Sequence, residues 1–278
     1  MFTLNCKGRL LVADKPLVMG VINATPDSFY AGSRQDTVEG ILRQAELMIN
    51  QGADILDIGG QSSRPGSSPV GEDDELNRVI EGIAAIHDHF PETFISIDTY
   101  YSKVASAAVD AGACMVNDIS AGSIDINMFT TVAGLHVPYV LMHMQGTLQT
   151  MQQSPQYENV TREVLDFFIN KIDLLKNIGI RDIVIDPGFG FGKSITHNFE
   201  LLRQLSIFKV IGHPILLGIS RKSTIYKTLG ITAEEALNGT TVLNTIGLIN
   251  GAQILRVHDV KEAKEAISLV QACMMRNV

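Results

Sequence analysis

The sequence predicts an α/β protein that folds as a (β/α)8 barrel with a short N-terminal β-hairpin. Eight short apolar runs, each ending in a polar residue, alternate with longer segments of helical periodicity. Strands that alternate with helices form parallel sheets through right-handed crossovers, and eight such units in about 260 residues fit a barrel. An open doubly wound sheet is the alternative, but no Gly-x-Gly-x-x-Gly segment follows the first strand.

The elements follow one another in a regular order. Residues 3–12 alternate between apolar and polar side chains and predict the hairpin. The expected strands are 18–23, 54–60, 94–99, 114–120, 138–144, 182–188, 214–220 and 253–259. The expected helices are 36–51, 73–90, 102–111, 126–136, 158–178, 194–211, 222–229, 232–250 (one helix or a pair) and 260–276. Because no Pro/Ser-rich linker divides the chain, we expect residues 1–278 to form a single domain.

Composition excludes several classes of function. The formal net charge of −8 argues against nonspecific binding of nucleic acid. No run reaches the roughly 18 apolar residues of a membrane span, and the N-terminus has no apolar signal core. Cys6, Cys114 and Cys273 lack the spacing of a zinc site. We therefore expect a cytoplasmic protein with three packing thiols and no nucleic-acid or membrane partner.

Polar residues end all eight expected strands. They are Asn23, Asp57, Asp98, Asn117, His143, Asp186, Ser220 and the pair Arg256 and His258. In a barrel the carboxyl ends of the strands converge at one mouth, where such enzymes place their sites. A single residue of this kind often only caps a loop, but a polar residue at every strand end favours a functional site.

Three of these residues form a group rich in hydrogen-bond acceptors, namely Asp98, Asn117 and Asp186. Carboxylates accept bidentate hydrogen bonds, so the group suits a flat heterocycle that carries several N–H donors. Bracing of the surrounding loops is one alternative. A metal site with two carboxylates is another, although hard cations usually take more oxygen ligands than this sequence makes evident.

Positive charge also gathers at the predicted mouth. Lys222 precedes a helix, whose free N–H groups favour an anion. Arg256 and His258 alternate along the last strand and therefore face the same side. With Arg64, they predict a site for a phosphate-like group. The alternatives are that Lys222 is a solvated cap and that Arg256 pairs with the carboxylates of the mouth itself.

Taken together, these segments resemble the dihydropteroate synthase family. The matching segments are GVINATPDSF (20–29), DIGGQSSRPG (57–66), SIDTY (96–100), NDIS (117–120), LMHMQG (141–146), DPGFGFGK (186–193), GISRKS (218–223) and RVHDV (256–260). The resemblance implies a transferase of folate biosynthesis that joins 4-aminobenzoate to 6-hydroxymethyl-7,8-dihydropterin diphosphate and releases pyrophosphate. It also implies a (β/α)8 barrel, a bound Mg²⁺ and a homodimer, and the family is the target of sulfonamides.

The resemblance assigns a role to each matching residue. The pterin is held by Asp98, Asn117, Asp186, Lys222 and Arg256. The diphosphate is held by Asn23, Ser63, Arg256 and His258, and Asn23 also contacts Mg²⁺. The aminobenzoate pocket is lined by Phe29, Arg64, Pro65, Phe191, Lys222 and Ser223. The catalytic residues are Asp98, Asp186, Lys222, Arg256 and Asp27.

The implied mechanism is a dissociative substitution, in which pyrophosphate departs before the aromatic amine attacks. Water must then be excluded, so residues 25–32 are expected to close over the site with Asp27 and Phe29. The chain departs from the family at Gln61, where Glu is common, and at residues 30–33. The competing functions are a silent pterin-binding paralogue, a pterin-barrel methyltransferase and an aldolase that uses Lys222 as a Schiff base.

Overall fold

The computed structural model describes residues 1–24, 34–61, 70–151 and 153–274, with the side chains of 34–37 excepted. Its eight parallel strands form one sheet in the order β8-β7-β6-β5-β4-β3-β10-β9. A parallel bridge between Ile185 and Ile215 brings β8 beside β9, so the sheet closes into a barrel and the predicted fold is confirmed. The strands are β3 (Leu17–Asn23), β4 (Ile55–Gly59), β5 (Phe94–Asp98), β6 (Met115–Asp118), β7 (Tyr139–Met142), β8 (Ile183–Asp186), β9 (Leu216–Leu217) and β10 (Ile254–Val257).

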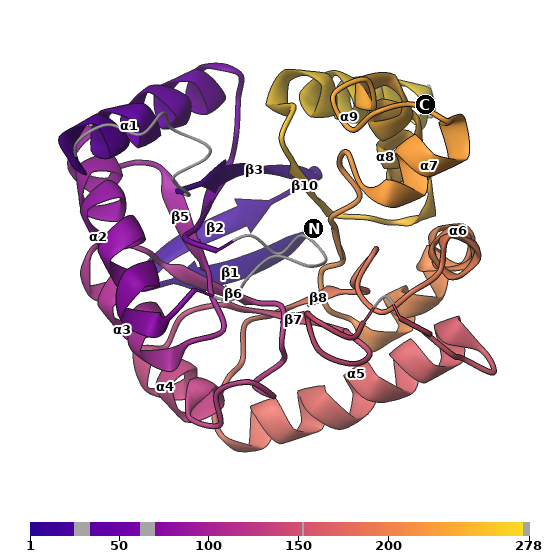
Figure 1. The fold of residues 1–278 in the computed structure, drawn as a ribbon, viewed down its shortest axis with the longest axis horizontal. Coiled ribbons are helices and arrows are strands. Elements are labelled where there is room, and N and C mark those ends of the chain that lie inside the picture. The colour runs from indigo at the N-terminus through magenta and orange to yellow at the C-terminus, as the bar shows by residue number, and fades with distance from the viewer. Residues whose placement is uncertain (25–33, 62–69, 152, 275–278) are drawn as a thin grey trace.

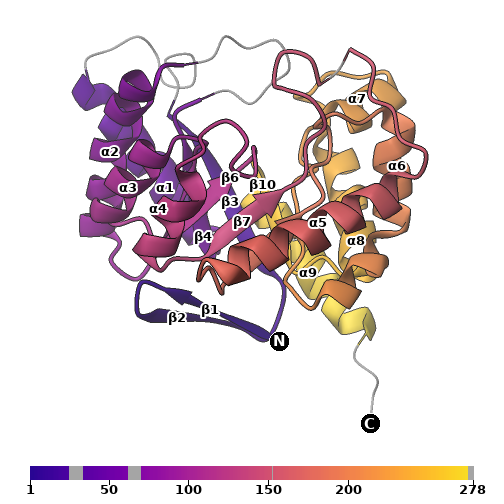
Figure 2. The ribbon, with the colours of Figure 1, turned by 90° about the horizontal axis from the view of Figure 1, so that it is seen from below.

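The N-terminal hairpin consists of the antiparallel strands β1 (Phe2–Cys6) and β2 (Arg9–Ala13). Its inward side chains, among them Leu4 and Leu11, pack with the first residues of several barrel strands. Figure 2 shows the hairpin lying across one end of the barrel. This end is thus filled by apolar side chains, whereas the carboxyl ends of the strands carry polar ones.

Helices surround the barrel (Figure 1). They are α1 (Arg34–Asn50), α2 (Glu72–His89), α3 (Ser102–Asp110), α4 (Met128–Leu135), α5 (Val160–Asn177), α6 (Ile195–Arg203), α7 (Ser223–Leu229), α8 (Leu237–Asn250) and α9 (Val260–Met274). Each long helix has an apolar face, as in α2, where Val79, Ile83 and Ile86 are fully buried. None of the helices in the described part of the chain is both long and apolar enough to span a bilayer.

Two expected helices differ from the structure. The helix expected over residues 194–211 is wrong, because α6 ends at Arg203 and a 3₁₀-helix, η1 (Leu205–Ile211), follows. Leu205 and Phe208 are both buried, and a 3₁₀-helix places side chains three residues apart on one face. The helix expected from residue 232 begins only at Leu237. The remaining helix ends differ from the expected ones by two residues or fewer.

Candidate active site at the carboxyl ends of the strands

An arginine and two aspartates meet inside the mouth, the end of the barrel formed by the carboxyl ends of the strands. Nε of Arg256 donates to Oδ2 of Asp57 over 2.6 Å, and Nη2 donates to Oδ2 of Asp98 over 2.5 Å. Nδ2 of Asn117 also donates to Oδ2 of Asp57, over 2.9 Å. Strands β4, β5, β6 and β10 thus contribute to one polar group, as expected for converging strand ends.

The charges in this group affect one another. Burial alone would lower the pKa of Arg256, but the carboxylates of Asp57 and Asp98 outweigh burial and raise it. The guanidinium therefore stays charged. Burial raises the pKa of Asp98 to about 7, although Arg256 acts in the opposite direction. Asp98 can therefore change its protonation state near neutral pH. The sequence left two options for Arg256, a phosphate-like ligand or the carboxylates of the mouth itself. In the structure Arg256 pairs with these carboxylates.

From the sequence, Asp57 is predicted only to lie at a strand end. All five residues of β4 are buried, and the side chain of Asp57 is completely so. A buried charge requires a partner of opposite charge. The pairing of Asp57 with Arg256 does have a signal in the sequence. Asp57 lies inside an otherwise apolar run, and Arg256 is the single arginine inside the last strand.

Asp186 and Lys222 lie on the other side of the mouth. Oδ1 of Asp186 accepts a hydrogen bond from the N–H of Gly188 over 2.7 Å, and burial raises the pKa of this carboxyl while Lys222 lowers it. Lys222 is the N-cap residue of α7, and its ammonium donates to the carbonyl of Phe189. Burial lowers the pKa of Lys222 to about 8. The side chain of Lys222 is therefore no solvated cap.

The segment 186–193 forms one wall of the mouth. Gly188 has a φ of +71°, and a Cβ atom there would lie 1.9 Å from the carbonyl oxygen of His143, so only glycine fits. The phenyl ring of Phe191 lies 4.5 Å from the ammonium of Lys222. Phe189 is fully buried in the main core instead. Of the two phenylalanines, Phe191 is therefore the one whose ring lies beside Lys222.

Other predicted residues lie at the rim. Nδ1 of His258 is 3.0 Å from Oγ of Ser220, and the imidazole is largely exposed. Asn23 ends β3, and Ser223 begins α7; both are half-buried. Arg221 forms a two-pronged ion pair with Asp259 at 2.8 Å, which gives this arginine a structural role.

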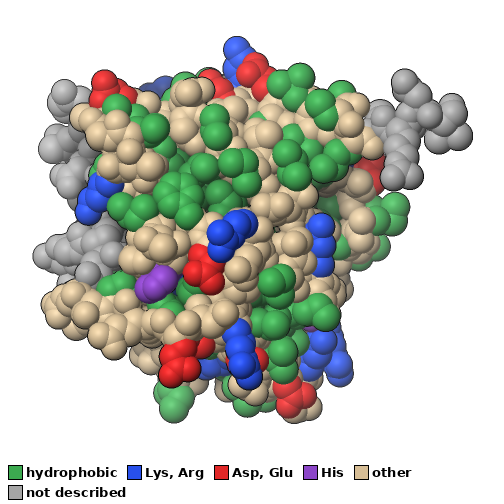
Figure 3. Space-filling model, turned by 90° about the vertical axis from the view of Figure 1, so that its right-hand side faces the viewer, with side chains coloured by type: hydrophobic (Ala, Val, Ile, Leu, Met, Phe, Trp, Pro, Cys, Tyr) green, Lys and Arg blue, Asp and Glu red, His purple; other side chains and the backbone are tan. Residues whose placement is uncertain are grey.

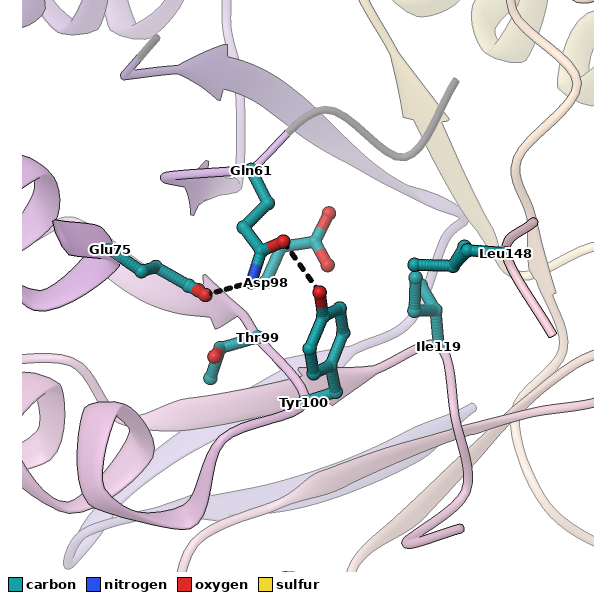
Figure 4. A pocket seen from close by; sticks show the side chains of 7 residues that line it. All are labelled: Gln61, Glu75, Asp98, Thr99, Tyr100, Ile119 and Leu148. Atoms are coloured by element: carbon teal, nitrogen blue, oxygen red, sulfur yellow. Dashed lines mark hydrogen bonds between the residues drawn. The ribbon is translucent and has the colours of Figure 1, made fainter. Parts of the chain in front are cut away.

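A small cavity of about 10 Å³ adjoins Asp98 (Figure 4). Beside it, Nε2 of Gln61 donates to the buried carboxyl of Glu75, and the hydroxyl of Tyr100 donates to Oε1 of Gln61 over 2.6 Å. Burial raises the pKa of Glu75. A glutamate at position 61 would place a second carboxyl against Glu75, whereas the amide of Gln61 supplies a donor. The departure at Gln61 therefore matches its surroundings.

Several predicted residues cannot be placed. Asp27, Phe29, Ser63, Arg64 and Pro65 lie outside the described residues, as do the expected lid at 25–32 and the departure at 30–33.

The described residues offer little to a metal ion by themselves. No group of three or more His, Cys, Asp or Glu side chains within 1–24, 34–61, 70–151 and 153–274 is arranged to hold one. Magnesium, however, is commonly bound by one or two protein ligands together with substrate phosphates. The amide oxygen of Asn23 fits this second type of site and not a site built from protein ligands alone.

The chain is similar to known proteins over nearly its whole length. The family model described as "Pterin binding enzyme" matches residues 19–258. The dihydropteroate synthase of Escherichia coli K12 is 41% identical over 270 residues, which are 96% of this chain and 95% of that protein.

Solved structures agree with this similarity. Dihydropteroate synthase of Xanthomonas albilineans with 4-aminobenzoic acid has a TM-score of 0.92 at 39% identity, covering 99% of this chain and 98% of that one. The same enzyme in complex with 7,8-dihydropteroate has a TM-score of 0.89 at 37% identity, covering 99% and 100%. The enzyme of Yersinia pestis, with a sulfonamide drug complex, has a TM-score of 0.91 at 37% identity and covers 98% of both chains.

Proposed function

This chain belongs to the pterin-binding enzyme family and, within it, to the dihydropteroate synthases, and from that membership we propose how its own residues carry out the reaction. The reaction condenses 6-hydroxymethyl-7,8-dihydropterin diphosphate with 4-aminobenzoate to give 7,8-dihydropteroate and pyrophosphate. The observation that carries the residue assignment is the buried group of Arg256, Asp57 and Asp98 opposite Asp186 and Lys222.

The pterin ring binds between these two halves of the mouth. Its N–H edge donates to the carboxylates of Asp98 and Asp186, and Asn117, already oriented by Asp57, adds an amide contact. Lys222 and Arg256 lie alongside the ring. Their two positive charges offset most of the negative charge of the three carboxylates of Asp57, Asp98 and Asp186.

The other substrate groups bind nearer the rim. Asn23, Ser63, Arg256 and His258 hold the diphosphate. The aminobenzoate stacks against Phe191, and its carboxylate meets Ser223 at the start of α7. Phe29, Arg64, Pro65 and Lys222 complete that pocket. When Mg²⁺ is bound at Asn23, it neutralises charge on the diphosphate.

The substitution proceeds dissociatively. The bond between the pterin methylene carbon and the diphosphate oxygen breaks, and its electron pair leaves with pyrophosphate, beside the guanidinium of Arg256. The positive charge left on the methylene spreads into the ring, where the carboxylates of Asp98 and Asp186 stabilise it. The lone pair of the aromatic amine then forms the new C–N bond, and the amine gives up its proton to the released pyrophosphate, the base that the reaction itself supplies. Asp27 is assigned a catalytic role from the family resemblance.

Release of pyrophosphate tests this function directly. The purified protein is incubated with both substrates and Mg²⁺, and pyrophosphate and dihydropteroate are measured together. We expect both products in equal amounts. A folded protein that binds the pterin diphosphate without releasing pyrophosphate would instead be a silent paralogue, and trapping of Lys222 by borohydride would indicate an aldolase.

Asp98→Asn is expected to weaken binding of the pterin diphosphate by about 10–100-fold, the scale of one charged hydrogen bond, and to change aminobenzoate affinity by less than about 3-fold. Protonation of Asp98 has the same effect as the substitution. Because burial raises its pKa to about 7, pterin affinity of the wild type falls as the pH drops below 7. Calorimetry from pH 5.5 to 8.5 measures both effects, and equal losses for the two ligands would contradict the assignment.

We also propose a homodimer that works in the cytoplasm. Val242, Ile246 and Ile249 are exposed on one face of α8, and Val210 of η1 is 76% exposed. Figure 3 shows apolar side chains gathered on this side of the barrel. Cys6 and Cys114 are free thiols in the same buried cluster, which suits a reducing compartment. Cys273 is exposed, so the expectation of three packing thiols is wrong for this residue. Sedimentation is expected to give a dimer for the wild type and a monomer for Val242→Glu/Ile246→Glu; a dimeric variant would place the interface elsewhere.

A further inference from the structure

Lys193 has no part in the proposed binding of substrates, yet its side chain is among the most buried in the protein. The residue is 2% exposed. Its Nζ lies 3.0 Å from the carbonyl oxygens of both Gly188 and Phe191, and 3.2 Å from the carbonyl oxygen of His143. It also lies 2.9 Å from Nδ1 of His143. Every polar contact of this amine thus goes to the segments that follow β7 and β8.

Burial of the Lys193 amine away from water costs free energy, and its hydrogen bonds must offset that cost. Burial lowers the pKa of Lys193 to about 7 and that of His143 to about 2. The imidazole is therefore neutral, and the pair carries at most one extra proton. The contacts of Lys193 join the segment 186–193 to the end of β7. An apolar side chain could not replace them, because it has no donor for the three carbonyl groups.

The segment that Lys193 closes carries the carbonyl that binds Lys222 and the carboxylate whose charge acts on it. Within it, the N–H of Gly188 binds the carboxylate of Asp186, and the carbonyl of Phe189 accepts from the ammonium of Lys222. The side chain of Asn198 supports the same segment by accepting from the N–H of Gly190 over 2.8 Å. A shift of the Gly188 or Phe191 carbonyl would therefore move the groups that hold Lys222.

We propose that Lys193 is a positioning residue for this reaction: its amine fixes the segment 186–193, so that the Phe189 carbonyl holds Lys222, near the charge of Asp186, in the position that binds the pterin. The inference rests on the proposed function. Lys193 itself does not touch substrate, because its own contacts enclose its amine. Its effect on binding must therefore pass through Lys222.

A double-mutant cycle tests this path. The variants are Lys193→Met, Lys222→Met and the double variant, and calorimetry measures the affinity of each for 6-hydroxymethyl-7,8-dihydropterin diphosphate. Lys193→Met alone is expected to weaken binding about 10–30-fold, the scale of a hydrogen-bonded charged group. In the Lys222→Met background the same change is expected to cost less than about 3-fold, because the group through which Lys193 acts is already gone. Additive losses would overturn the proposal.

Lys264→Met is the control for loss of a charged contact made by a partly buried lysine. Nζ of Lys264, whose side chain is 24% exposed, donates to Oδ2 of Asp54 over 2.6 Å at the amino-terminal end of β4. This variant is expected to lower Tm but to leave pterin affinity unchanged; an equal loss of affinity would assign Lys193 a merely structural role. Lys193→Gln keeps an amide donor and replaces Lys193→Met in the cycle if that variant does not fold. If the wild type neither binds the diphosphate nor releases pyrophosphate, the proposed function fails; if it does both and the cycle is additive, the positioning role alone fails.

Discussion

Lys222→Met is expected to lower kcat/KM for the pterin diphosphate by about 10²–10³-fold while the protein stays folded, the size of effect seen when one preorganised charged donor is removed from a reacting centre. The ammonium lies between the Phe189 carbonyl and the ring of Phe191, and Asp186 favours its charge. Methionine keeps most of the side-chain volume and removes only the charge and the donors. The loss is therefore expected in turnover and not in stability.

A pH profile separates the charge of Lys222 from its shape. Because burial lowers its pKa to about 8, the wild type loses the ammonium, and with it activity, as the pH rises above 8. Lys222→Arg is expected to retain partial activity and to move this alkaline limb upward, since a guanidinium stays protonated. Lys227→Met, an exposed position on the same helix, is the control and is expected to behave as the wild type. Near-normal turnover in Lys222→Met would contradict the assigned role.

The barrel was predictable because its signals are local. Each strand is a short apolar run with polar residues at or just beyond its carboxyl end, and all eight runs contain a strand of the barrel. The break after Arg203 was not predictable in this way. Leu205 and Phe208 are three residues apart, a spacing that suits an α-helix and a 3₁₀-helix equally over so short a segment. The late start of α8 depends on a tertiary contact, because the guanidinium of Arg221 donates to the carbonyls of Ala233 and Glu234, which would otherwise accept within a helix.

The site was predictable in its residue types and only partly in its contacts. The acceptors and cations in the sequence predicted a charged mouth. The residues that meet there are Asp98, Asn117, Asp186, Lys222 and Arg256. Their pairings depend on closure of the sheet, which brings together residues as far apart in sequence as Asp57 and Arg256. The contacts of Lys193 with three carbonyl oxygens could not be predicted either. Every residue carries a backbone carbonyl, so the sequence does not show which of them a side chain contacts.

Arg256→Met is expected to lower the free energy of unfolding by about 3–5 kcal/mol, the cost of breaking a buried ion pair from one side. The substitution leaves the carboxylate of Asp57, whose side chain is completely buried, without its positive partner. The loss corresponds to a fall in Tm of about 10 °C for a domain of this size, so the protein remains folded at 25 °C. Turnover is also lost, because the guanidinium lies beside the departing pyrophosphate. Urea denaturation and steady-state kinetics at pH 7.5 measure the two effects on the same sample.

A second substitution distinguishes the unpaired charge from the lost side chain. In Arg256→Met/Asp57→Asn no buried carboxylate remains at position 57, and an asparagine oxygen can still accept from Nδ2 of Asn117. We therefore expect the double variant to be more stable than Arg256→Met alone, whereas its kcat/KM stays low because the guanidinium is still missing. Further destabilisation by Asp57→Asn in the Arg256→Met background would show that packing of the arginine stem, and not the charge of Asp57, determines the stability of the mouth.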